Sequence, residues 1–179
     1  MSHTVPEVAH RLVLLRHAKS AWPSGVPDHE RPLAGKGRRN AHAAGEWFTT
    51  GGPRPDLVLV SDATRTQQTW EIVRGSFPIA PRSRVEPRIY AADVAELLEV
   101  IAEVEENVGT LCLVGHEPGM STTALTLASP ESERAVVSAV ARKFPTGAVA
   151  VLALACAWAA LGPRRALLES FAVPRAAPG

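Results

Sequence analysis

The sequence lacks several features that would assign it to a specialised class of protein. Its 19 lysine and arginine residues are balanced by 18 aspartate and glutamate residues, and no basic run suggests a nucleic-acid or membrane partner. The longest uninterrupted apolar run, residues 148–161, is too short to cross a bilayer as a helix. Residues 1–10 contain no apolar core, so we expect no signal peptide.

Cysteine is also scarce. Cys112 and Cys156 are the only two, they lie far apart, and each sits inside an apolar run. We therefore expect buried free thiols in a cytoplasmic protein rather than a metal knuckle or a redox pair. The length of 179 residues fits one domain, with its core at about residues 11–174 and loose flanks at 1–10 and 175–179.

Short apolar runs alternate with amphipathic segments along the chain. Strands are predicted at 11–15, 57–60, around 85, 110–114, 148–155 and 166–173, and helices over 35–49, 65–77, 92–108, 118–127 and 131–141. This alternation predicts a single-domain three-layer α/β/α sandwich with a mostly parallel sheet. The link between the last two strands is too short for a crossover helix, so we expect one antiparallel strand near the end.

Polar segments follow three of the predicted strands. Arg16 and His17 follow the first strand, Ser61 and Arg65 follow the second, and His116 follows the strand at 110–114. Because the carboxyl ends of parallel strands share one edge of a sheet, these side chains should converge where α/β proteins bind ligands. Two imidazoles beside two guanidinium groups indicate a phosphate pocket that contains a nucleophile.

Each of these residues has a chemical role in such a pocket. A neutral imidazole is nucleophilic at physiological pH, and His17 is the candidate. The guanidinium groups of Arg16 and Arg65 match the phosphoryl oxygens in geometry and neutralise their charge. His116 can donate a hydrogen bond to the same oxygens in the transition state.

The same three segments resemble the histidine phosphatase superfamily. Arg31-Pro32-Leu33, followed by Gly35 and Gly37 and without a large insertion, resembles the small SixA-like phosphohistidine phosphatase branch rather than the phosphoglycerate mutases. The resemblance covers about residues 12–174. It implies a phosphoglycerate mutase-like fold and a phosphatase that forms a phosphohistidine intermediate on His17.

For three residues near the expected pocket, the sequence allows both a functional and a structural interpretation. Ser61 stands at the family's usual position and either binds phosphate or is a turn residue. Arg31 matches an arginine of the small branch and either binds substrate or shapes the loop over the pocket. Trp22, in the loop after His17, either touches substrate or packs against the protein.

Other positions carry less information or depart from the family pattern. Lys19 replaces the acidic residue common in the superfamily, and Pro23 replaces a phosphate-binding asparagine of the mutases, so both argue against mutase activity. The remaining histidines receive no role and are expected to be exposed or to cap local structure. They are His3, His10, His29 and His42.

No residue stands out as a general acid, since the nearby sequence offers only Glu86, Asp93 and Glu96. An alkoxide leaving group needs a proton, whereas a phosphorylated imidazole can leave as a neutral ring. We therefore expect a phosphatase without metal or cofactor that acts on phosphohistidine in proteins. The alternatives are a phosphomonoesterase for a small metabolite and a catalytically weak domain that binds phosphorylated partners.

Overall fold

Six strands form one sheet in the order β3-β2-β4-β1-β5-β6. The computed structural model describes residues 8–177, and its strands are β1 (His10–Arg16), β2 (Leu57–Val60), β3 (Arg82–Val85), β4 (Thr110–Gly115), β5 (Val149–Leu154) and β6 (Ala166–Ala172). The α-helices are α1 (Gly35–Thr50), α2 (Thr64–Arg74), α3 (Val94–Ala102), α4 (Gly119–Leu127) and α5 (Arg134–Arg142). Within residues 8–177, no helix has both the length and the apolar composition needed to cross a membrane.

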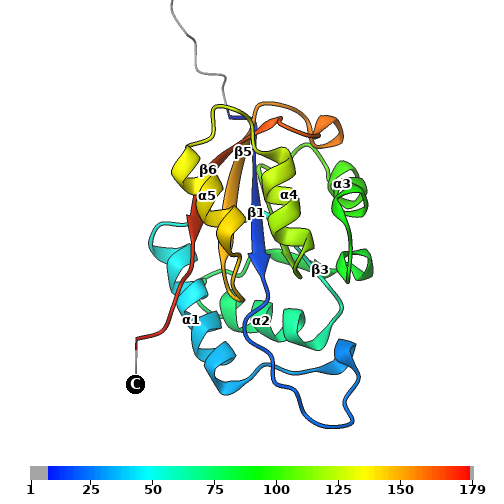
Figure 1. Cartoon of the computed structure of the whole chain (residues 1–179), viewed down its shortest axis with the longest axis vertical. Helices are drawn as coiled ribbons and strands as arrows, with labels where there is room; N and C mark the ends of the chain where they lie inside the picture. Colours follow the sequence, from blue (N-terminus) through cyan, green and yellow to red (C-terminus); the bar gives the residue numbers. More distant parts are fainter. Residues whose placement is uncertain (1–7, 178–179) are drawn as a thin grey trace, which may run out of the picture.

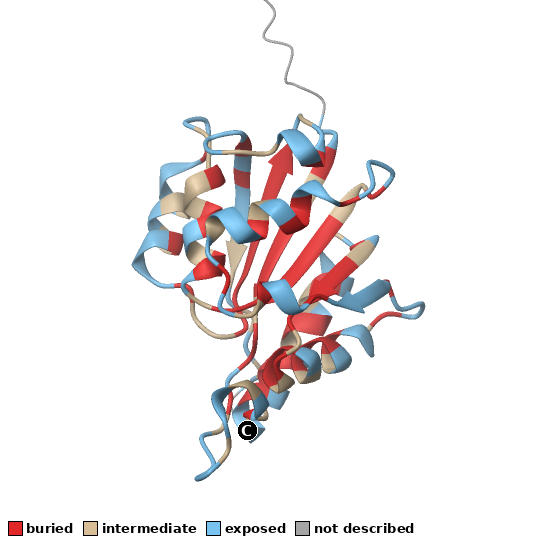
Figure 2. Cartoon of the chain, turned by 90° about the vertical axis from the view of Figure 1, so that its right-hand side faces the viewer, coloured by how far each residue is buried: buried red, intermediate tan, exposed pale blue. Residues whose placement is uncertain are grey.

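Alternate residues of the central strands face two separate apolar layers. In β1, Leu12 and Leu14 join the cluster that includes α3, α4 and α5, whereas Val13 and Leu15 join the cluster that includes α1 and α2. A sheet covered on both faces requires this alternation. Figure 1 shows α4 and α5 in front of β1 and β5, and Figure 2 shows that the inner strands are buried along most of their length. The predicted three-layer α/β/α architecture is confirmed.

One strand runs against the others, as predicted. β3, β2, β4 and β1 pair in parallel, whereas β5 is antiparallel to both of its neighbours, β1 and β6. Because β5 lies between these two strands rather than at the sheet edge, it makes two antiparallel pairings. The short link to β6 is therefore a hairpin-like return to the edge of the sheet.

The predicted helix at 92–108 is shorter in the structure. α3 begins after Asp93, whose side chain forms a capping box with Glu96, and it ends at Ala102. The segment beyond it is acidic and contains Glu103, Glu105 and Glu106. Carboxylates are unfavourable at the negative end of a helix dipole, so the chain continues as turns. The other predicted elements differ from the structure only at their ends.

The expectation that His10 is exposed or caps local structure is wrong. His10 is the first residue of β1 and is buried. Its Nδ1 lies 3.0 Å from the carbonyl oxygen of Val108, and its Nε2 lies 3.0 Å from a carboxylate oxygen of Glu106. Its ring also packs on Trp158 at a centroid distance of 4.6 Å. These acceptors offset the cost of removing the ring nitrogens from water.

The remaining histidines and the cysteines have different environments. His42 is exposed, His29 is partly buried, and His3 lies outside the described residues. Both cysteines are free thiols, but only Cys112 is buried. Cys156 is partly exposed, contrary to expectation, because it lies in the turn after β5.

The flanks can be compared with the structure only in part, because residues 1–7 and 178–179 lie outside the described residues. On the amino-terminal side, His10 already belongs to β1. On the carboxyl-terminal side, the backbone N–H of Ala176 donates to Oδ1 of Asn40 in α1 at 3.3 Å. Contacts with the core therefore extend slightly beyond residues 11–174.

The register of the sheet aligns the ends of β1, β4 and β2. Arg16 in β1 lies opposite Gly115 in β4. Just beyond the strands, the N–H of His17 donates to the Gly115 oxygen and the N–H of Ser61 donates to the Val114 oxygen, both at 3.0 Å. The sheet itself therefore positions the polar segments that follow its strands.

We predict that Gly37→Ala lowers the free energy of unfolding by about 1–3 kcal/mol, because the added methyl group would overpack the contact between α1 and the loop after β1. A Cβ atom at Gly37 would lie 2.9 Å from the carbonyl carbon of Lys19 and 3.0 Å from its nitrogen. Urea denaturation measures the change. The matched control is Gly35→Ala, since the nearest atom to its Cβ would be Nη1 of Arg39 at 3.8 Å. Equal stability of the two variants would contradict the close packing.

Candidate active site

His17 is held by its own chain directly after β1. The residue is 6% exposed, and its Nδ1 lies 2.7 Å from the carbonyl oxygen of Ala18. Because a carbonyl oxygen only accepts, Nδ1 carries the proton and Nε2 keeps its lone pair. Burial and the charges of Arg65, Arg16 and Arg31 lower the pKa of the ring to about 4, against the opposing effect of the Ala18 hydrogen bond. The imidazole is therefore neutral at neutral pH.

His116 faces His17 from the end of β4, with 5.2 Å between the ring centroids. Its Nε2 lies 2.8 Å from Oγ of Ser61, and its Nδ1 lies 3.3 Å from Nη2 of Arg65. A guanidinium group only donates, so Nδ1 accepts and Nε2–H donates to the hydroxyl. Burial, followed by the influence of His17 and Arg65, lowers the pKa of His116 to about 3. This ring is neutral as well.

Two arginines bring unused hydrogen-bond donors to the same place. Nη1 of Arg16 donates to the Phe144 oxygen at 2.7 Å, and Nη1 of Arg65 donates to the Asp28 oxygen at 2.6 Å. The Nε atom of each arginine is buried and has no partner within residues 8–177. An unpaired buried donor costs about 1–3 kcal/mol, so these groups favour an anionic ligand.

Asp28 is a site residue that no sequence pattern indicates, because it begins a short 3-10 helix, Asp28–Glu30, that carries no recognisable motif. Its Oδ2 accepts from the Tyr90 hydroxyl at 2.7 Å and from Nη2 of Arg65 at 3.1 Å. Its Oδ1 accepts from Nε of Arg31 at 3.0 Å. The Tyr90 hydrogen bond, with the charges of the two arginines, lowers the pKa of Asp28 to about 2. This carboxylate is ionised and orients the guanidinium group of Arg65.

Tyr90 is the second residue that the sequence patterns missed. It follows the short turn Pro87–Ile89, and its ring meets His116 edge to face at a centroid distance of 5.3 Å and an angle of 87°. The hydrogen bond to Asp28 raises the pKa of its hydroxyl. The one sequence feature that could have drawn attention to Tyr90 is that it is the only tyrosine in the chain.

Arg31 reaches the site through Asp28. Arg31 is 6% exposed, and its guanidinium carbon lies 3.4 Å from the ring centroid of Trp22. Trp22 itself is 78% exposed. The indole therefore packs on the arginine with one face and leaves most of its surface to solvent.

All six predicted site residues lie at this edge of the sheet: Arg16, His17, Arg31, Ser61, Arg65 and His116. His116 is in direct contact with Ser61 and Arg65, and its ring faces that of His17. The arrangement can bind a phosphoryl group between two arginines while it presents a neutral imidazole to phosphorus.

The carboxylates considered as general acids have structural partners. Glu86 accepts hydrogen bonds from Nε and Nη2 of Arg88 at 2.9 Å each, and these bonds lower its pKa. Asp93 and Glu96 form the capping box of α3. All three carboxylates are therefore engaged in hydrogen bonds that hold local structure.

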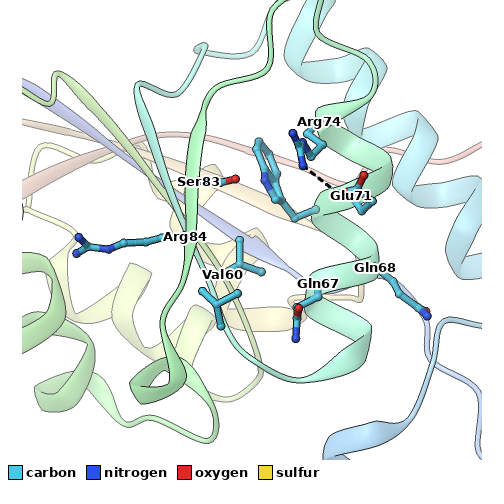
Figure 3. Close-up of a pocket in the computed structure, with 9 residues that line it drawn as sticks. Val60, Gln67, Gln68, Glu71, Arg74, Ser83 and Arg84 are labelled. Atoms are coloured by element: carbon cyan, nitrogen blue, oxygen red, sulfur yellow. Dashed lines mark hydrogen bonds and ion pairs between the residues drawn. The ribbon is translucent and has the colours of Figure 1, made fainter.

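Neither a metal centre nor the hollow beside α2 is part of this cluster of residues. Within residues 8–177, no group of three or more His, Cys, Asp or Glu side chains could hold a metal ion. A hollow of about 410 Å³ lies between α2 and the edge strand β3, and Figure 3 shows Ser83 turned toward the helix and Arg84 turned away from it. Val60 and Gln67 line this hollow but neither His17 nor His116 does, so it neighbours the candidate site without being part of it.

The sequence model that describes the histidine phosphatase superfamily (branch 1) matches residues 12–110 of this chain. An uncharacterized protein of Mycobacterium tuberculosis, Rv1276c, is 44% identical over 90% of this chain and 100% of its own length.

Two solved structures are similar along nearly the whole chain. A candidate phosphohistidine phosphatase SixA from Nakamurella multipartitia is 35% identical with a TM-score of 0.81, covering 94% of this chain and 98% of its own. A second candidate SixA, from Agrobacterium tumefaciens, is 30% identical with a TM-score of 0.76, covering 93% of this chain and 99% of its own.

We predict that the His17 ring titrates near pH 4, well below the ~6.5 of an unperturbed histidine. Between these two values the unfolded chain binds more protons than the folded chain, so the contribution of this group to stability falls as the pH falls. NMR titration of the ring protons measures the pKa, and the spectrum of His17→Gln assigns the signal. A titration at or above the value of an unperturbed histidine would contradict the buried, cation-flanked environment.

Proposed function

Since this chain belongs to the histidine phosphatase superfamily and is a phosphatase, we propose that it hydrolyses phosphohistidine in proteins through a phosphohistidine intermediate on His17. The observation that carries this proposal is the neutral His17 ring beside two arginines, Arg16 and Arg65, whose buried Nε–H donors have no partner within residues 8–177. The similarity to two candidate SixA phosphatases supports the choice of substrate class.

In the first step, Nε2 of His17 attacks phosphorus. The new N–P bond forms as the bond to the leaving group breaks, and the leaving group takes the electron pair of that bond. Arg16 and Arg65 donate to the phosphoryl oxygens and stabilise the charge that spreads over them. The hydrogen bond from Nδ1–H to the Ala18 oxygen keeps the attacking ring in the correct tautomer.

Ser61 and His116 act together on the phosphoryl group. His116 donates its Nε2–H to Oγ of Ser61, so the serine is free to donate its own O–H to a phosphoryl oxygen. This path through Ser61 replaces the direct donation expected from His116. In the second step, water attacks phosphorus, the N–P bond breaks, His17 recovers its electron pair, and inorganic phosphate leaves.

The leaving group decides between the candidate substrates. An alkyl ester needs an acid for its departing oxygen, but Glu86 is held by Arg88 and the ionised Asp28 has no proton to give near neutral pH. A substrate phosphohistidine that is protonated on its second ring nitrogen leaves as neutral imidazole. The site therefore favours phosphohistidine over an alkyl phosphate.

We expect that His17→Ala lowers turnover of phosphohistidine by at least about 10³-fold, because the variant loses the nucleophile. In the wild type, rapid quenching of labelled substrate should trap label on the protein that is stable to alkali and lost in acid. The matched control is His42→Ala, an exposed histidine in α1 that should keep full activity. A His17→Ala variant that folds and keeps more than a few per cent of turnover would sink the nucleophile assignment. Binding of phosphorylated ligands without any trapped label would favour the non-catalytic alternative.

Turnover should rise steeply as the leaving group improves. We expect kcat/KM for phosphohistidine to exceed that for an alkyl ester such as phosphoglycerate by at least about 10²-fold, the usual contribution of a general acid. Asp93→Asn and Glu96→Gln keep helix-capping side chains and should change neither rate. Equal rates on the two substrates would favour the small-metabolite phosphomonoesterase. Loss of alkyl ester cleavage alone in either variant would identify the missing acid.

A further inference from the structure

Trp22 is unusually exposed for a tryptophan. Its side chain is 78% accessible, and it is the one aromatic residue among the large apolar side chains exposed within residues 8–177. It lies in the loop between β1 and α1, five positions after His17. Exposing an indole to water is unfavourable, and such side chains are enriched at protein interfaces.

The loop holds this indole in a defined position. The N–H of Ala21 donates to the Pro32 oxygen at 2.8 Å, and Ser20 forms an antiparallel bridge with Leu33. Arg31 lies against the indole, with its guanidinium carbon 3.4 Å from the ring centroid. The exposed surface of Trp22 is therefore preorganised, which reduces the entropy lost when a partner covers it.

Trp22 is also connected to the candidate active site. Nε of Arg31 donates to Oδ1 of Asp28, and Oδ2 of the same carboxylate accepts from Nη2 of Arg65. The indole thus forms the outer end of a continuous set of contacts that reaches a phosphate-binding arginine.

Exposed cations lie beside the same loop. Ala34 donates its N–H to the Lys19 oxygen at 2.8 Å, so the first turn of α1 lies directly against Lys19. Lys19 is exposed, and so are three cations in the first turns of α1: Lys36, Arg38 and Arg39. None of the four takes part in an ion pair within residues 8–177.

We propose that Trp22 and the adjacent cations form a docking surface for the protein that carries the phosphohistidine, and that this protein presents an acidic face beside its phosphorylated histidine. The inference rests on the proposed function. A small metabolite is usually enclosed by its pocket, whereas Trp22 projects outward on the surface and suits a broad partner. Unpaired lysines and arginines at its side add attraction for acidic side chains.

The test compares Trp22→Ala with the wild type on three probes. One is a small folded acidic protein phosphorylated on a surface histidine with phosphoramidate, and the others are free phosphohistidine and p-nitrophenyl phosphate. We expect kcat/KM on the protein probe to fall at least about tenfold, mainly through KM, as for an aromatic contact at the centre of an interface. Both small probes should change by less than about twofold. Trp22→Phe should restore most of the loss.

Two further variants complete the design. Ile79→Ala is the matched control, since Ile79 is also 78% exposed but lies before β3, away from the carboxyl ends of the strands. It should leave all three rates unchanged. Lys36→Glu should lower kcat/KM on the acidic protein probe alone, and a carboxylate near a helix amino terminus does not weaken the helix.

The possible results separate the proposals. Equal losses on all probes with Trp22→Ala would show that the indole only holds Arg31, and would overturn the docking role. Losses confined to p-nitrophenyl phosphate and free phosphohistidine would instead identify a platform for small aromatic substrates. An unchanged rate on the protein probe would overturn docking and leave the proposed function intact. A wild-type enzyme that cleaves only p-nitrophenyl phosphate would overturn both the docking role and the proposed function. If Lys36→Glu has the same kcat/KM as the wild type on the protein probe, the partner does not need an acidic face.

Discussion

The in-register parallel pairing of β1, β4 and β2 brings the polar segments of the candidate site together. It places Arg16 opposite Gly115 and ties the backbones of His17 and Ser61 to the end of β4. Residues that are far apart in the sequence therefore meet at a rigid edge with buried side chains behind them. A shift of one residue in this register would turn the polar segments toward the opposite face and separate the two imidazoles.

Burial and positive charge act in the same direction on the two histidines. Both effects disfavour the imidazolium form, so the pKa values of His17 and His116 fall to about 4 and about 3. The arginines proposed to bind the phosphoryl group thus also keep the proposed nucleophile neutral. The cost is that the buried Nε–H groups of Arg16 and Arg65 have no partner within residues 8–177.

The loop between β1 and α1 contributes the balancing negative charge. Asp28 accepts hydrogen bonds from Arg65, Arg31 and Tyr90, and it thereby joins this loop to α2 and to the segment after β3. The same loop carries Trp22 outward. Orientation of the arginines and the proposed docking surface therefore both depend on one short segment.

The succession of strands and helices along the chain, the covering of both sheet faces, and the candidates Arg16, His17, Arg65 and His116 could all be predicted from the sequence. These follow from apolar periodicity and from polar residues at strand ends, which are local patterns. The contacts of Asp28 and Tyr90 could not be predicted in this way, since their partners lie on other elements and no local spacing encodes them. The burial of His10 and the early end of α3 were also not predicted. Long-range packing outweighs local propensity at His10, and accumulated negative charge does so at the end of α3.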